Sequence, residues 1–95
     1  MIAPEFEWDA DKEAANLQKH GVSFAQAAVA FSDPFGVDWI DDRQDYGEER
    51  VILLGMTDGQ VLTVVYTERE TRIRIISARR ATRYEQEIYI RENSA

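Results

Sequence analysis

The chain has 95 residues, 44% of them hydrophobic, and its 18 acidic and 11 basic side chains give a net charge of -7. This length and composition indicate one globular domain with a modest core, spanning residues 1–95, and exclude a disordered chain. The absence of cysteine excludes a disulfide and a thiolate zinc site, and without an apolar run of about 20 residues or a signal sequence we expect a cytoplasmic domain.

Capping signals place two helices in the first third of the chain. Asp9 precedes a helical segment at residues 11–20, and Gly21 supplies the left-handed residue that commonly ends a helix. A capping box that starts at Ser23 opens a second helix over residues 24–31. The apolar stripe expected for the first helix is thin: Ala14, Leu17 and Gln18.

The middle of the chain has the apolar alternation and turn residues of β-structure. Asp58-Gly59 is a preferred two-residue hairpin turn, and Arg69-Glu70 is the expected second turn. A capping box at Thr82 then begins a last helix over residues 83–93. The order of two helices, four strands and one helix predicts an α+β domain around a four-stranded antiparallel sheet. The expected strands are residues 35–40, 50–56, 60–67 and 71–78.

The two turns fix a predicted register for this sheet. They place Leu53 opposite Val64 and Tyr66 opposite Ile73, which gives one face a continuous apolar core. A slip of one residue would bring Arg72 and Arg74 onto that face, which the cost of burying their charges forbids. We therefore expect both arginines on the opposite face, which is partly apolar and which a helix or a partner chain should cover in part.

Six of the nine arginines lie within residues 69–83, a stretch with a net charge of +5 in an acidic chain. Because exposed charges more than about 8 Å apart are largely screened, such a cluster can attract phosphate locally. Guanidinium groups here can clamp a phosphodiester, or they can pair with the acids of the first half of the chain; both interpretations stay open. We expect Arg69 in a turn, and Arg79 and Arg80 between the last strand and the last helix, to be the freest. The members of the cluster are Arg69, Arg72, Arg74, Arg79, Arg80 and Arg83.

Other candidate residues are few. His20 is the only histidine, which excludes a two-histidine mechanism and a multi-histidine metal site; it can be a cation at the helix end or, with Lys19, face a substrate. The acidic segment 41–49 lacks the calcium-loop pattern and is expected to be a solvated loop or a contact for basic residues of another chain. Tyr89 is a better catalytic candidate than Tyr66, which the register buries. We expect no metal and no cofactor.

Several motifs that occur together and in order resemble those of the BrnT toxins. The resemblance extends from Phe6 to about Tyr89, which is nearly the whole chain. BrnT proteins are the ribonuclease partners in the BrnT–BrnA type II toxin–antitoxin systems of bacteria. The motifs are FEWD (6–9), NLQKHGVSFAQA (16–27), FSDP (31–34), DDRQDYGEER (41–50), VVYTER (64–69) and RIISARRAT (74–82).

The resemblance implies a RelE-like fold, in which helices flank a central antiparallel sheet, and metal-independent cleavage of RNA. It also implies inhibition by a BrnA-like antitoxin with a ribbon-helix-helix DNA-binding part. The toxin–antitoxin complex would repress its own promoter, and the toxin would contact promoter DNA only through the antitoxin. A toxin homodimer within a toxin–antitoxin heterotetramer is compatible with this. Family features fall on Lys19, His20, Arg69, Arg79 and Tyr89.

These expectations combine into one hypothesis for the mechanism. Arg69 and Arg79 would clamp the scissile phosphate while the 2′-hydroxyl attacks it, and His20 or Tyr89 would transfer protons. An alternative from another functional class is a non-catalytic module that docks an antitoxin or regulator through the same arginines. The remaining basic residues would extend the RNA-binding track: Lys19, Arg72, Arg74, Arg80 and Arg83.

Overall fold

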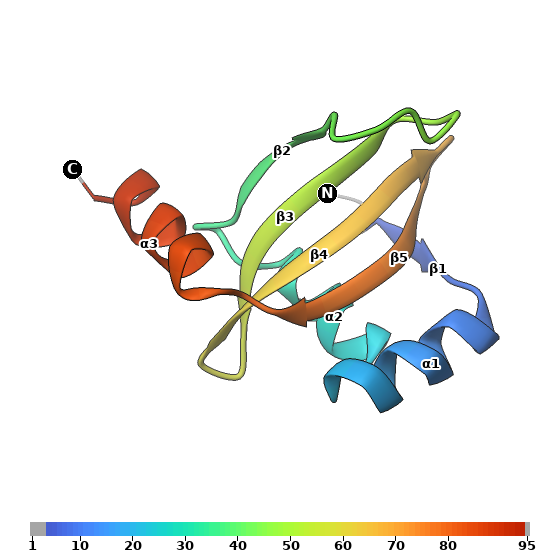
Figure 1. Cartoon of the computed structure of the whole chain (residues 1–95), viewed down its shortest axis with the longest axis horizontal. Helices are drawn as coiled ribbons and strands as arrows, with labels where there is room; N and C mark the ends of the chain where they lie inside the picture. The colour runs from blue at the N-terminus through green and yellow to red at the C-terminus, as the bar shows by residue number, and fades with distance from the viewer. Residues whose placement is uncertain (1–3, 95) are drawn as a thin grey trace.

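The computed structural model describes residues 4–94 as three helices and one five-stranded sheet (Figure 1). The strand order is β1-β5-β4-β3-β2, with β1 parallel to β5 and the other neighbours antiparallel. Within the described residues, no helix is long and apolar enough to cross a membrane. The elements are β1 (Glu5–Glu7), α1 (Ala10–His20), α2 (Phe24–Ala30), β2 (Val37–Asp41), β3 (Arg50–Thr57), β4 (Gln60–Arg69), β5 (Arg72–Arg80) and α3 (Arg83–Glu92).

The predicted α+β class with three helices is confirmed, but the prediction of a four-stranded, purely antiparallel sheet is wrong. The sheet has a fifth strand, β1, which makes it mixed because Phe6 pairs with Ile73 in a parallel register. Three residues are too few to show an alternating pattern, and their pairing depends on a strand more than 60 positions away in the sequence. Phe6 also packs edge-on against Phe31 at 5.1 Å between ring centroids.

Local side-chain bonds begin and end the helices as the sequence predicts. The carboxylate of Asp9 accepts a hydrogen bond from the backbone N–H of Lys12, and Gly21 ends α1 with a φ of 69°. Complete capping boxes begin α2 at Ser23 and α3 at Thr82. The predicted apolar stripe of α1 is wrong, because its three residues are exposed and Asn16 is the buried position.

Asn16 joins α1 to the sheet through its amide. Its Nδ2 donates to the carbonyl oxygens of Val22 and Ala78, at 3.0 and 2.8 Å, and its Oδ1 accepts from the N–H of Ala78 at 3.1 Å. An amide in an otherwise apolar interface is tolerated because all three bonds are made.

The predicted register is confirmed for the first hairpin and wrong for the second. Leu53 lies opposite Val64, and Asp58 and Gly59 form the turn with positive φ angles. In the second hairpin Arg69 pairs with Arg72 and is not a turn residue, so Tyr66 lies opposite Ile75. This displacement is two residues, and an even displacement keeps Ile73 and Ile75 on the predicted core face.

A β-bulge in β5 changes which arginines share a face. Val65 pairs with Ser77 and Tyr66 with Ile75, which leaves Ile76 as the extra residue. Beyond the bulge the alternation is inverted. Arg79 therefore lies opposite Thr63 on the face that carries Arg74, whereas regular alternation would place it on the core face.

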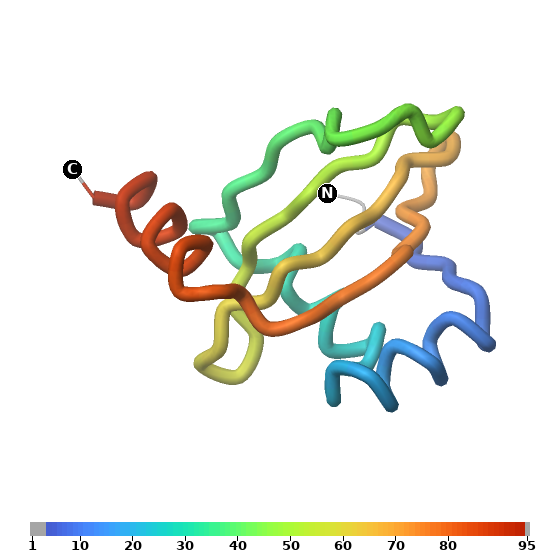
Figure 2. Tube along the Cα trace, viewed as in Figure 1, coloured from blue at the N-terminus to red at the C-terminus, as the bar shows by residue number. Residues whose placement is uncertain are grey.

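The core lies between the sheet and the helices α1 and α2, which cover one face of the sheet, while α3 projects beyond the end where β5 finishes (Figures 1 and 2). Gly55 allows the close approach of α2, because a Cβ there would lie 2.5 Å from the carbonyl oxygen of Ala30. The buried cluster comprises Val22, Phe24, Ala27, Ala30, Leu53, Leu62, Val64, Tyr66, Ile75 and Ala78.

Candidate functional site

The arginine cluster is divided between the two ends of β5. Arg69 and Arg72 lie beside the β4–β5 turn, whereas Arg79 and Arg80 are the last two residues of β5. Arg72 and Arg79 lie seven positions apart along β5, or about 23 Å at roughly 3.3 Å per residue. The structure does not bring Arg69 and Arg79 together, so the predicted clamping of one phosphate by this pair is wrong. Arg79 and Arg80 also lie within the strand, not after it.

The arginines nearest the β4–β5 turn face carboxylates. Arg69 lies 3.6 Å from Glu48, while Arg72 and Arg74 face residues of β1: Glu5 at 3.7 Å and Glu7 at 3.1 Å. These pairs lie at the surface, where an ion pair contributes about 0–1 kcal/mol, although Glu48, Arg74 and Glu7 are half-buried. They offset the local positive charge, and two of them depend on the strand that the sequence did not predict.

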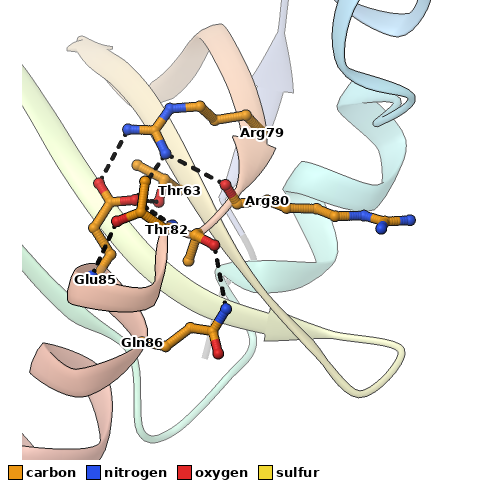
Figure 3. Close-up of polar contacts among 7 residues, drawn as sticks. Thr63, Arg79, Arg80, Thr82, Glu85 and Gln86 are labelled. Atoms are coloured by element: carbon orange, nitrogen blue, oxygen red, sulfur yellow. Dashed lines mark hydrogen bonds and ion pairs between the residues drawn. The ribbon is translucent and has the colours of Figure 1, made fainter.

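Arg79 fixes the start of α3 (Figure 3). Its Nη1 and Nη2 donate to the two carboxylate oxygens of Glu85, at 2.7 and 3.0 Å. Glu85 also accepts from the hydroxyl of Thr63 at 3.0 Å and from the backbone N–H of Thr82 at 2.8 Å. Burial opposes the ionisation of Glu85, but the bonds from Arg79, Thr82 and Thr63 outweigh it and lower its pKa to about 2.

We predict an acid-sensitive attachment of α3. Because folding lowers the pKa of Glu85 from its ordinary 4.5 to about 2, its ionised form stabilises the fold above pH 4.5. This contribution is lost as the pH falls from 4.5 to about 2. Glu85→Gln should therefore lower the free energy of unfolding, measured with urea, at pH 7 and have little effect near pH 2. An equal loss of unfolding free energy at both pH values would contradict the role of the carboxylate. Glu87→Gln, at an exposed site of the same helix, is the control.

Arg80 differs from the rest of the cluster. Arg69, Arg72, Arg74, Arg79 and Arg83 each have a carboxylate within 4.0 Å, whereas Arg80 forms no ion pair with any residue in the range 4–94. Its side chain is exposed and extends away from that of Arg79 (Figure 3).

Arg80 lines two hollows at the end of the sheet. The smaller, of about 140 Å³, lies between Arg80, Gly21 and Asp58. The larger, of about 440 Å³, is called the Arg80 cavity below, and residues of α3 and of the β3–β4 hairpin form its walls. The Arg80 cavity is lined by Met56, Gly59, Gln60, Val61, Arg80, Gln86, Tyr89 and Ile90.

Tyr89 lies in the wall of the Arg80 cavity, but its hydroxyl is bound. The Oη donates to Asp33 Oδ2 at 2.6 Å, and this carboxylate also accepts from the N–H groups of Phe35 and Met56. Burial and the neighbouring Asp33 raise the pKa of Tyr89 to about 12. Tyr89 therefore keeps its proton near neutral pH, which suits it to anchor α3 and does not suit it to act as a base. No local sequence pattern reveals the bond between Asp33 and Tyr89, because the two residues lie 56 positions apart.

The end of α1 approaches Arg80 from the other side. Lys19 and His20 are the last residues of α1, and the next residue, Gly21, lines the smaller hollow with Arg80. Lys19 is exposed and His20 half-buried. The structure thus gathers the end of α1, Arg80 and Tyr89 at one end of the sheet. Arg83 begins α3 nearby in the chain and is exposed, and Arg69, Arg72 and Arg74 lie toward the other end.

Sequence reasoning missed two polar residues of the Arg80 cavity, Gln60 and Gln86. Both are exposed, and Gln86 donates from its amide to the carbonyl oxygen of Ala81 at 3.3 Å. Glutamine at a strand start or in a helix is an ordinary surface residue, so only the tertiary arrangement identifies these two. Their amides can donate hydrogen bonds to phosphate or base oxygens.

The acidic loop between β2 and β3 is partly ordered by its own side chains. Asp41 is buried, and its two oxygens accept from Arg43 at 2.7 and 2.8 Å, while Tyr46 donates to it at 3.0 Å. The bonds from Arg43 lower the pKa of Asp41 despite burial. The guanidinium of Arg50 stacks on the ring of Tyr46 at 4.2 Å. The predicted solvated loop is therefore wrong for Asp41. No group of three potential metal ligands occurs within residues 4–94.

A known protein family matches most of the chain. The model of a family described as "Ribonuclease toxin, BrnT, of type II toxin-antitoxin system" matches residues 8–85. The matched segment includes every strand except β1 and reaches the start of α3. No curated protein matches the chain.

Proposed function

Because the chain belongs to the BrnT family of ribonuclease toxins of type II toxin–antitoxin systems, we propose that it cleaves RNA at the Arg80 cavity without a metal ion. The observation that carries this proposal is the free guanidinium of Arg80. It is the one arginine of the cluster without a carboxylate partner among the described residues, and it borders both hollows. A guanidinium in this state is available to a phosphate without first breaking an internal ion pair.

The chemistry requires few groups. The 2′-oxygen bonds to the adjacent phosphorus, the bond from phosphorus to the 5′-oxygen breaks, and the products are a 2′,3′-cyclic phosphate and a 5′-hydroxyl. Holding the reacting atoms in line supplies on the order of 7–11 kcal/mol of the barrier. Arg80 donates two N–H bonds to the non-bridging oxygens and neutralises the charge that develops on them.

Proton transfer is assigned to His20. The 2′-hydroxyl loses a proton and the 5′-oxygen gains one, and histidine is the side chain best suited to such exchange near neutral pH. His20 directly precedes Gly21, which lines the smaller hollow together with Arg80. The hydroxyl of Tyr89, in contrast, donates its proton in a hydrogen bond to Asp33. Tyr89 would then act by positioning α3.

We predict that His20→Ala lowers the rate of RNA cleavage about 100-fold, the lower range for a lost general acid or base. The variant should fold normally because the side chain makes no hydrogen bond with another described residue. Single-turnover cleavage of a labelled RNA measures the rate, and Lys12→Ala on the same helix is the control. Wild-type rates in His20→Ala would remove the residue from the mechanism.

The proposed reaction is tested with purified protein, excess EDTA and a short labelled RNA. Cleavage should persist with the chelator and leave 2′,3′-cyclic phosphate ends. An RNA with one 2′-deoxynucleotide at the cleaved position should remain intact there, because the nucleophile is absent. Loss of cleavage with EDTA, restored by a divalent ion, would contradict the metal-independent reaction.

The remaining basic residues are proposed to extend RNA binding. Lys19 and Arg83 lie on elements that border the catalytic end. The turn-end arginines would bind RNA further along the sheet after exchanging their acid partners for phosphate. The turn-end arginines are Arg69, Arg72 and Arg74. Arg79 supports the site by holding α3.

Membership in a type II system implies an antitoxin partner. We propose that this partner is BrnA-like and has a ribbon-helix-helix DNA-binding part, that promoter DNA is contacted through it, and that two toxins assemble in a cytoplasmic heterotetramer. The molar mass of the purified complex, measured by light scattering, tests the stoichiometry.

A further inference from the structure

An exposed apolar groove continues from the Arg80 cavity. Phe35, Met56 and Ile90 have exposed fractions of 58%, 40% and 64%, although all three are large hydrophobic residues. They line a groove of about 510 Å³ together with Tyr89 and residues at the end of α3. Because Met56, Tyr89 and Ile90 also line the Arg80 cavity, the groove and the cavity form one continuous depression.

The groove is preformed and does not depend on its apolar side chains. Polar bonds hold α3 in place: Arg79 to Glu85, Tyr89 to Asp33, and Asn93 Nδ2 to the carbonyl oxygen of Phe35 at 2.9 Å. The exposed side chains therefore remain available for a ligand, and clustered exposed apolar residues of this kind commonly mark a binding surface.

We propose that this groove is the docking site of the antitoxin. An amphipathic segment of that protein would place apolar side chains on Phe35, Met56 and Ile90, and one of its carboxylates on Arg80. The carboxylate follows from charge complementarity, since Arg80 has no acid partner in the described chain and ends the depression. This inference rests on the proposed function for the role of Arg80, but the groove stands on its own geometry.

The chemistry of the depression favours a protein segment over RNA. The groove is lined by apolar side chains, by Asn93 and Ser94, and by Asp33, whose carboxylate is already hydrogen-bonded. Its lining includes no lysine or arginine, whereas RNA binding requires positive charge along the phosphates. An occupant that reached Arg80 would also block the phosphate site, so inhibition would follow directly from binding.

The test compares two glutamate substitutions of exposed apolar residues. Phe35→Glu alters the groove and not the lining of the Arg80 cavity, and Leu17→Glu, on α1 and 48% exposed, is the matched control. The probe is the purified cognate antitoxin of this toxin–antitoxin pair. Its Kd should rise about 30-fold or more for Phe35→Glu, as for an interface hot spot, and remain unchanged for Leu17→Glu. Thermal unfolding confirms that both variants fold, and Phe35→Ala is the milder variant if Phe35→Glu does not.

RNA cleavage by the free toxin separates the outcomes. Phe35→Glu should cleave RNA at the wild-type rate while resisting inhibition by the antitoxin. An unchanged Kd would overturn the proposal, as would an equal loss of RNA cleavage, which would assign the groove to RNA. A third outcome would assign the groove to a second copy of the toxin: the free wild-type toxin is a dimer, whereas the Phe35→Glu variant is a monomer that binds the antitoxin normally. If Arg80→Ala retains cleavage while Phe35→Glu loses the antitoxin, the proposed catalytic site fails and the docking site stands.

Discussion

Arg80→Ala is expected to lower the rate of RNA cleavage about 10²–10³-fold, the loss typical of removing one preorganised donor to a developing oxyanion. The fold should be unaffected, because the exposed guanidinium forms no ion pair with another described residue. Single-turnover cleavage of a labelled RNA measures the rate, and thermal unfolding measures the stability. In cells the same variant should abolish growth arrest.

Two further variants show whether shape or charge matters. Arg80→Lys keeps the positive charge and loses the planar fork, so it should recover only part of the activity. Arg91→Ala removes an exposed arginine at the end of α3 and should cleave RNA at the wild-type rate. Full activity of Arg80→Ala, with loss of activity in Arg69→Ala, would move the catalytic centre to the β4–β5 turn.

Asn16→Leu is expected to have the largest effect on stability. The substitution has nearly the same size but leaves three backbone groups without a partner: the carbonyl of Val22 and both the carbonyl and the N–H of Ala78. Each buried polar group left unsatisfied costs about 1–3 kcal/mol, so the loss is about 3 kcal/mol or more. Since small domains have only about 5–15 kcal/mol of stability, much of the total would be lost.

Urea unfolding at pH 7 measures this loss. Gln18→Leu is the matched control, because it makes a similar change at an exposed position of the same helix and should alter the free energy of unfolding by less than about 0.5 kcal/mol. A loss below about 1 kcal/mol in Asn16→Leu would mean that water replaces the amide, and the attachment of α1 would have to be sought elsewhere.

The sequence alone determined the features that short-range chemistry controls. Asp9, Ser23 and Thr82 begin helices because each side chain bonds a backbone N–H within the next few residues. Asp58 and Gly59 fix the first hairpin because their positive φ angles select the turn. The density of arginine in residues 69–83 also predicted which segment carries the positive charge, and the quoted motifs predicted the family that the comparison confirms.

Only the tertiary structure decided how the arginines are used. The pairing of β1 with β5 supplies Glu5 and Glu7 to the turn-end arginines, and the bulge at Ile76 sends Arg79 toward Glu85 and leaves Arg80 beside the cavity. Both features arise from contacts between segments that are far apart in the chain, and such contacts cannot be predicted from the local sequence pattern of either segment. Charge density is a property of the sequence, but the availability of one guanidinium depends on which carboxylates folding brings within about 4 Å of it.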